Sequence, residues 1–320
     1  MVVHSTYLDV GVLRDTLLPN LGVQAALALP VYLIGRSQNY YEAKDWLWGG
    51  GQVASAWWAA IGRHIASGVP LSAVVKSISK PGWLLLTGVT AWGGHLLYRV
   101  ASRAIKRGHD DHRYDEAKKD PSGWNKAFFS LFGLEALVQA VITLPFTVPF
   151  RLTAPAPVPP AKLKDLIHGF AIAVFTAGLT LEVLADAQLG THQEENKPGL
   201  LKEGVWSIVR HPNYLGDILI HSSWPILLYA NGLFNPLVLL GPIANWFFLR
   251  NVSGDKENEA SQAERYQRTD PQKKAEFDQY RQEKNSVWPA VSELGNKWTW
   301  IVLGAGAVGA AAERLISSLF

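Results

Sequence analysis

The chain has 320 residues, of which 48% are hydrophobic and only 18% are charged, and it contains no cysteine. The missing cysteines exclude a disulfide scaffold, thiolate zinc sites and a cysteine nucleophile. The apolar content excludes a disordered chain, and a net charge of +3 is too small to indicate a nucleic-acid partner.

Long segments free of Asp, Glu, Lys and Arg recur along the chain. A helix needs about 17–25 mostly apolar residues to cross a bilayer core. In chain order the segments are 16–35, 46–62, 81–98, 127–150 (interrupted only by Glu135), 166–181, 218–249 and 298–312. So many apolar segments in one chain favour a membrane protein over a soluble helical core.

The segment 218–249 is too long for one span. Its 32 residues would form a helix of about 48 Å, against a bilayer core of about 30 Å. Asn231-Gly232 and Asn235-Pro236 lie near its middle and are turn signals. We therefore predict a hairpin of two helices here, and an all-α, multi-pass transmembrane helix bundle of about seven or eight spans.

Two loops carry most of the basic residues. The loop after residue 98 holds Arg99, Arg103, Lys106, Arg107, Arg113, Lys118, Lys119 and Lys126; the loop after residue 249 holds Arg250, Lys256, Arg265, Arg268, Lys273, Lys274, Arg281 and Lys284. Four predicted spans separate these loops, so both lie on one side, which the positive-inside rule makes cytosolic. The segment 182–217 falls on the same side, and the proline-rich segment 153–160 falls opposite.

The segment 204–217 is the strongest local motif and lies at the cytosolic end of a predicted span. Arg210 and His211 can hold phosphate or carboxylate, the arginine as a planar fork. Pro212 ends any preceding helix, and Asn213 can cap the next one. The N–H groups at such a helix start favour anionic ligand groups. An arginine at the membrane interface followed by a simple turn would give the same pattern.

Several segments together resemble a known family. The run from Arg210 to Asp217, Arg-His-Pro-Asn-Tyr-Leu-Gly-Asp, resembles the signature of an uncharacterised, DUF1295-type branch of the steroid-reductase C-terminal domain family, related to steroid 5-alpha-reductases and delta-14 sterol reductases. Further blocks match in order: 91–99 with 107–114, 182–188, and 252–254 with Glu259 and 277–280. The resemblance covers residues 83–289, and the polar run 255–258 departs from the family's apolar pattern.

The resemblance implies an integral membrane oxidoreductase. It would reduce a carbon–carbon double bond in a lipid-like or steroid-like enone with NADPH, in a membrane such as the endoplasmic reticulum. Its partners would be the lipid bilayer and a hydrophobic small-molecule substrate. Carried over by motif, the residues that would line the cofactor pocket are Glu182, Asp186, Arg210, His211, Asn213, Tyr214 and Asp217.

Glu182 and Asp186 are four residues apart and share one helix face. A carboxylate at membrane depth costs about 2.5–3.5 kcal/mol on insertion scales, so two on one face indicate a polar cavity. They could accept hydrogen bonds from ribose hydroxyl or amide groups. The alternative is that they mark only the cytosolic end of the helix.

The catalytic acid has two candidates. Charge developing on an enone oxygen has to be stabilised by a proton donor. Glu135 is the only formal charge in its 24-residue segment, and its cost at membrane depth makes it a candidate; an interhelical hydrogen bond would explain it equally well. Tyr214 is the second candidate, although a cofactor contact would also account for it.

Two other functions stay open. Isoprenylcysteine carboxyl methyltransferases carry a similar Arg-His-Pro-x-Tyr-x-Gly run, which would make the chain an S-adenosylmethionine-dependent membrane methyltransferase. A non-catalytic, lipid-binding relative would keep the fold alone. Substrate identity and oligomeric state are not readable from the sequence.

Two further motifs are better explained without a ligand. The run 304–309, Gly-Ala-Gly-Ala-Val-Gly, imitates a dinucleotide fingerprint, but the sequence given ends before the required second strand; small residues that pack a terminal membrane helix explain it better. The run His109-Asp-Asp-His112 has metal-type residues but no further ligands in its charged loop, so we expect no metal site.

By family similarity we divide the chain into three parts. Residues 1–80 form N-terminal membrane helices without a matching motif. Residues 81–290 form the steroid-reductase-like membrane domain with its cytosolic loops. Residues 291–320 add one C-terminal membrane helix.

Overall fold

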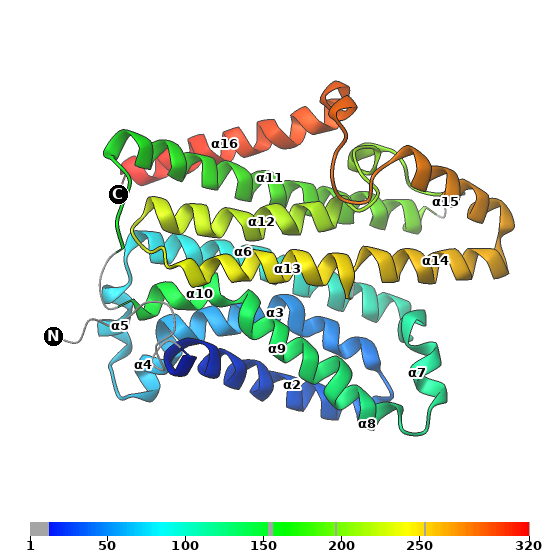
Figure 1. Ribbon diagram of the computed structural model, residues 1–320, viewed down its shortest axis with the longest axis horizontal. Helices are drawn as coiled ribbons and strands as arrows, with labels where there is room; N and C mark the ends of the chain where they lie inside the picture. Colours follow the sequence, from blue (N-terminus) through cyan, green and yellow to red (C-terminus); the bar gives the residue numbers. More distant parts are fainter. Residues whose placement is uncertain (1–12, 153–155, 196, 253, 320) are drawn as a thin grey trace. The chain divides into compact units, whose positions relative to one another are not determined.

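The computed structural model describes residues 13–152, 156–195, 197–252 and 254–319. These residues form helices and connecting segments, with no strand among them, so the all-α prediction is confirmed. The chain divides into two compact units, residues 1–158 with 231–244 and residues 159–230 with 245–320. Figure 1 shows the order of the helices along the chain.

The first unit contains the helices from α2 to α10 and one later turn. Their bounds are η1 Leu13–Leu17, α2 Leu18–Gln38, η2 Tyr41–Asp45, α3 Trp46–Trp57, η3 Trp58–Gly62, α4 Arg63–Ala66, α5 Leu71–Ser77, α6 Lys80–Arg107, η4 His112–Tyr114, α7 Asp115–Lys119, α8 Gly123–Ala127, η5 Phe128–Gly133, α9 Leu134–Ile142, α10 Leu144–Thr147, η6 Val148–Arg151 and η8 Pro236–Leu239. Helix α2 packs on α9 and α3, and α3 packs on α6.

Buried amides join the helices of the first unit. Asn20 on α2 donates to the carbonyl oxygen of Ala140 (3.2 Å) and to the Thr147 hydroxyl (2.9 Å). Gln24, one turn later, donates to the carbonyl of Gly51 (3.0 Å) and to Ser55 (2.9 Å) on α3. These polar side chains are paired inside the unit, as intramembrane polar groups have to be.

The second unit is built on three long helices. Its elements are α11 Ala161–Glu194, η7 Gly204–Ser207, α12 Pro212–Ala230, α14 Asp255–Thr269, α15 Pro271–Glu283, η9 Val291–Gly295 and α16 Lys297–Leu319. Helix α13, Leu240–Asn251, begins in the first unit and ends in the second. Helix α11 packs against both α12 and α16.

Helices α11 and α12 approach each other at two glycines. A Cβ added to Gly178 would lie 2.7 Å from the carbonyl oxygen of Gly216, and one added to Gly216 would lie 2.6 Å from that of Gly178. These distances are shorter than real Cβ contacts, so only glycine lets the two backbones come this close. The same contact sets Gly216 against the backbone of Glu182.

Helix α16 lies on α11 through small residues. A Cβ on Gly306 would lie 2.6 Å from the carbonyl oxygen of Ala173, and one on Gly309 would meet the Thr176 side chain. The glycines of the run 304–309 therefore belong to a helix–helix contact, as predicted, rather than to a strand-to-helix phosphate loop. At the far end of this contact Nε2 of His168 lies 3.3 Å from Oε2 of Glu313.

Four helices within the described part of the chain are long and apolar enough to cross a membrane. They are 18–38, 123–142, 161–194 and 297–319. The chain is thus membrane-like, but the count of seven or eight spans is not confirmed. The other apolar segments also form helices. Helix α3 continues through the π-helical turn η3 into α4, α13 follows directly on η8, and α12 contains Asp217 and His221.

The helix break predicted within 218–249 is present, and the hairpin of two membrane spans stays a prediction. Helix α12 ends at Ala230, and Gly232 follows with a φ of 69°, a conformation that favours glycine. Asn235 then accepts a hydrogen bond from the backbone N–H of Leu237 (3.0 Å) at the start of the next turn. The division into residues 1–80, 81–290 and 291–320 stays a prediction, and the two packed units follow other boundaries.

We predict that Gly178→Ala destabilises the protein by about 1–3 kcal/mol, because the new methyl group has to push α12 away from α11. Thermal melting in detergent measures this effect. Gly169→Ala on the same helix is the matched control, since a Cβ there meets nothing within 4 Å. Equal melting temperatures for the two variants would contradict the close contact.

Candidate functional site

The start of α12 is covered by the segment that follows α15. The backbone N–H groups of Arg210 and His211 donate to the carbonyl oxygens of Asn285 (3.0 Å) and Ser286 (2.9 Å). These residues immediately precede Pro212, the first residue of α12. Two N–H groups at this helix start are thus satisfied by the chain itself.

Glu259 on α14 binds both side chains of the Arg-His pair. The Arg210 guanidinium donates from Nε to Oε1 (2.8 Å) and from Nη2 to Oε2 (3.1 Å), which is the parallel fork geometry of strong arginine–carboxylate pairs. His211 Nε2 lies 2.8 Å from Oε1. Arg281 on α15 adds a third cationic or polar partner, with its Nε 3.1 Å from Oε2.

These contacts shift the pKa values of both acid–base groups. Burial alone would raise the Glu259 pKa, but hydrogen bonds from His211 and Arg210 outweigh it and lower the pKa to about 2. Burial lowers the His211 pKa, and the hydrogen bond to Glu259 compensates only in part. His211 is therefore the neutral member of the cluster at pH 7.

A hollow of about 460 Å³ opens beside this cluster. It is lined by Arg210, Asp278, Arg281 and Gln282. Asp278 forms an ion pair with Lys274, one helical turn earlier (2.5 Å). The two arginines that line the hollow, Arg210 and Arg281, are also the two that contact Glu259. The cationic surface of the hollow and the Glu259 cluster therefore share these two side chains.

The predicted carboxylates lie deeper along the α11–α12 pair. Glu182 is 2% exposed, and its Cβ would lie 3.0 Å from a Cβ placed on Gly216. Asp217 follows Gly216 and is also buried, with Oδ1 3.3 Å from Nε2 of the fully buried His221. The glycine contact thus brings Glu182 and the start of α12 together, whereas Asp186, one turn further along, is half-buried.

Asn213 and Tyr214 occupy the first turn of α12. The Tyr214 ring stacks on the His211 imidazole, with centroids 5.2 Å apart and planes at 9°. The Oδ1 atom of Asn213 is buried and has no hydrogen-bond partner among the described residues. A buried acceptor without a partner is costly, so this atom is available to a donor group of a ligand or a water.

The loop before the motif is fixed on α11. Gln188 accepts a hydrogen bond from the backbone N–H of Val205 (2.9 Å), and Trp206 Nε1 donates to the carbonyl of Ala185 (3.0 Å). Gly204 has a φ of 65°, and a side chain there would collide with Gln188. This turn sets where the chain enters the Arg-His pair.

The other catalytic candidate, Glu135, belongs to the first unit. It is 3% exposed, and its Oε2 lies 3.4 Å from Nζ of Lys44. Lys44 also contacts Asp45 at 2.8 Å. Burial alone would lower the Lys44 pKa, but Asp45 and Glu135 hold it well above its usual value. Glu135 therefore has a cationic partner within its own unit, and its catalytic role stays a prediction.

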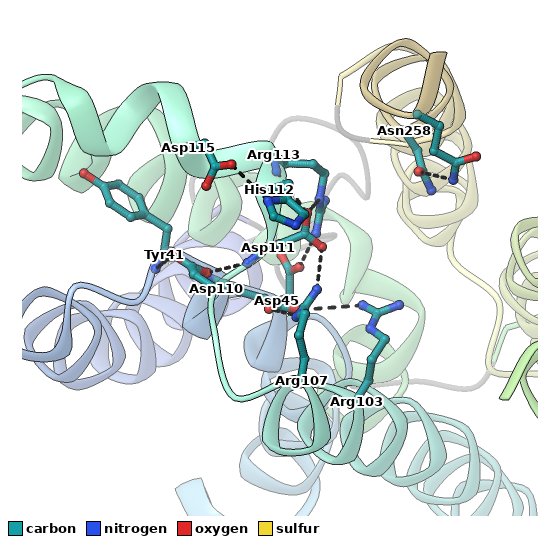
Figure 2. A network of polar contacts seen from close by, with 12 residues as sticks. Tyr41, Asp45, Arg103, Arg107, Asp110, Asp111, His112, Arg113, Asp115 and Asn258 are labelled. Atoms are coloured by element: carbon teal, nitrogen blue, oxygen red, sulfur yellow. Dashed lines mark hydrogen bonds and ion pairs between the residues drawn. The ribbon is translucent and has the colours of Figure 1, made fainter. Parts of the chain in front are cut away.

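Two aspartates fix the loop 107–115 through ion pairs and hydrogen bonds. Figure 2 shows Asp111 between Arg107 and Arg113, at 3.1 and 3.3 Å. Asp110 accepts from the backbone N–H groups of Tyr41 (2.8 Å) and Glu42 (2.9 Å). No group of three or more His, Asp or Glu side chains in the described part of the chain could hold a metal ion.

Sequence reasoning did not assign three residues of this site. Glu259 entered only as part of the family resemblance, Arg281 only as a basic loop residue, and His221 not at all. Glu259 and Arg281 lie far along the chain from Arg210, so no local spacing could have joined them. His221 had a detectable signal, since it lies one helical turn after Asp217 within an apolar segment.

The chain belongs to the family described as a protein of unknown function (DUF1295), whose model matches residues 31–284. The match begins at residue 31, so it includes much of the N-terminal part in which the motifs alone find no counterpart. No curated protein and no solved structure matches the chain.

We predict that the protein loses stability as the pH falls below about 6.5. The folded state keeps His211 neutral, whereas the unfolded chain binds a proton there below its ordinary pKa. Glu259 adds a second loss between about pH 5 and 2, because its folded pKa is depressed. His211→Gln should flatten the first step of a melting-temperature profile in detergent, and the control His192→Gln should leave it unchanged.

We predict that Lys44→Met destabilises the protein by about 3–5 kcal/mol, since it leaves the buried Glu135 without its cation, while Asp45 keeps Arg113. Glu135→Gln should cost less, about 1–3 kcal/mol, because Lys44 keeps Asp45. Detergent melting curves of both variants provide the measurement. A larger loss for Glu135→Gln than for Lys44→Met would argue against this pairing.

Proposed function

We propose that this member of the family is an integral membrane oxidoreductase. It uses NADPH to reduce a carbon–carbon double bond in a lipid-like or steroid-like enone, in an internal membrane such as the endoplasmic reticulum with its basic loops cytosolic. The observation that carries the proposal is the start of α12, where an arginine-lined hollow lies at one end of a helix pair that buries two carboxylates.

The residues at this place fit the chemical groups of NADPH. Its phosphates require cationic or N–H donors, and Arg210 and Arg281 line the hollow. Its ribose hydroxyls and carboxamide require acceptors, and the buried Oδ1 of Asn213 lacks a partner among the described residues. We propose that these residues hold the cofactor, with Asp217, Glu182 and Asp186 as further acceptors; bound there, NADPH supplies a hydride.

The protein itself has to supply a proton and exclude water. Tyr214 is the proton donor we propose, because its ring is fixed by stacking on His211 next to the hollow's Arg210. The apolar candidate spans support a hydrophobic substrate, which would reach the site from the bilayer. The buried setting of Asp217 strengthens electrostatic contacts with any polar ligand group, since little water competes there.

Two alternative functions have specific support. The buried carboxylates Glu182 and Asp217 would suit the sulfonium cation of S-adenosylmethionine, as in a membrane methyltransferase. The occupation of the Arg210 fork by Glu259 would suit a non-catalytic lipid-binding relative. The net cationic lining of the hollow favours an anionic cofactor over both.

The purified protein in detergent should melt at a higher temperature with NADPH than without ligand. A ligand that binds only the native state adds about 2.7 kcal/mol at roughly 100 times its Kd. NADP and S-adenosylmethionine are run in parallel. Stabilisation by S-adenosylmethionine alone would overturn the reductase proposal, and no shift with any of them would favour the lipid-binding relative.

Two variants tie this shift to the site. Asp217→Asn and Arg281→Gln should reduce the NADPH shift, whereas Arg268→Gln should not, because Arg268 pairs only with the exposed Glu264 on α14 among its described contacts. Arg210→Ala is less informative, since it also removes contacts to Glu259 and to the segment after α15.

A further inference from the structure

The Arg210 guanidinium is nearly saturated with protein acceptors. Its Nε and Nη2 donate to Glu259, and its Nη1 donates to the carbonyl oxygens of Arg281 (3.1 Å) and Lys284. A guanidinium has five N–H donors, and these contacts use four of them. A ligand phosphate that enters the hollow therefore meets an arginine whose fork is already filled.

The group that fills the fork has the geometry of a ligand. A carboxylate and a phosphate both present two oxygens to the parallel N–H bonds of an arginine. Glu259 presents its two oxygens to Arg210 in this way, and its Oε2 also lies 3.1 Å from Nε of Arg281. Both arginines that line the hollow thus face one internal anion.

The other charges of the hollow are already balanced. Asp278 pairs with Lys274 at 2.5 Å, and Gln282 is neutral. Glu259 is therefore the counter-ion of the two arginines, and it is buried, with a side chain 7% exposed. Its removal from the fork would leave the arginines free for a phosphate.

We infer that Glu259 is an internal stand-in for the ligand phosphate. Binding then becomes an exchange, in which the phosphate takes over the Arg210 fork and Glu259 retreats to His211, whose Nε2 lies 2.8 Å from Oε1. The exchange lowers the affinity for phosphate-bearing ligands and keeps the arginines paired while the hollow is empty. The inference rests on the proposed use of this hollow by a phosphate-bearing cofactor.

The test compares Glu259→Gln with Glu264→Gln in the purified full-length protein. Both variants remove one negative charge from α14, but Glu264 forms an exposed pair with Arg268 away from the hollow. NADPH and sodium pyrophosphate are titrated, and Kd is obtained from the rise in melting temperature. Glu259→Gln should bind both about tenfold more tightly than the wild type, and Glu264→Gln should bind them as the wild type does.

Glu259→Asp keeps the test decisive if Glu259→Gln does not fold. Aspartate keeps the charge but is one methylene shorter, so it weakens the paired hydrogen bonds with Arg210. The Kd of Glu259→Asp for NADPH and pyrophosphate should therefore fall between those of the wild type and of Glu259→Gln. Binding by either variant that equals the wild type, or is weaker, overturns the inference.

The two ligands separate this inference from the proposed function. If pyrophosphate binds Glu259→Gln more tightly but NADPH shifts no variant, the stand-in role holds and the NADPH reductase proposal fails. If NADPH shifts the wild type and Glu259→Gln equally, the stand-in role fails and the cofactor proposal holds. Failure of both ligands to shift any variant overturns both.

Discussion

The close contact of Gly178 on α11 with Gly216 on α12 is the constraint on which the site depends. A Cβ atom added to either glycine would lie only 2.6–2.7 Å from the backbone carbonyl oxygen of the other. Glu182 is one turn beyond Gly178, and Asp217 is next to Gly216. The contact therefore holds two buried carboxylates on neighbouring helices, and any side chain larger than hydrogen at either glycine would separate them.

A second constraint is the internal neutralisation of the basic segments. In the first basic loop, Arg103, Arg107, Arg113, Lys118 and Lys126 all pair with carboxylates of their own unit. In the second unit, Arg250 pairs with Asp255 and Lys284 with Glu293. These basic side chains, which a count along the chain would treat as a free surface, are thus paired with carboxylates of the folded units.

The same principle gives the Arg-His pair two roles. Its backbone N–H groups bind the segment after α15, and its side chains bind Glu259 on α14. The pair therefore joins the start of α12 to α14 and to the segment after α15 even without a ligand. This structural role and the proposed phosphate-binding role use the same Arg210 guanidinium. Both roles are possible if a ligand phosphate replaces Glu259 as the partner of Arg210.

The sequence by itself determined the helical class, the membrane-like segments, the family and the helix break within 218–249. These follow from composition, from hydropathy over windows of about 20 residues, and from Gly and Pro at turns, which are local properties of the chain. The motif from Arg210 to Asp217 was also visible as a short run.

Only the tertiary structure decided which residues meet. Glu259 and Arg281 join Arg210 across dozens of residues of chain, Lys44 contacts Glu135 on another helix, and Gly178 meets Gly216 where α11 packs on α12. Ion pairs and close backbone contacts depend on distances between segments, and no periodicity along the chain encodes those distances.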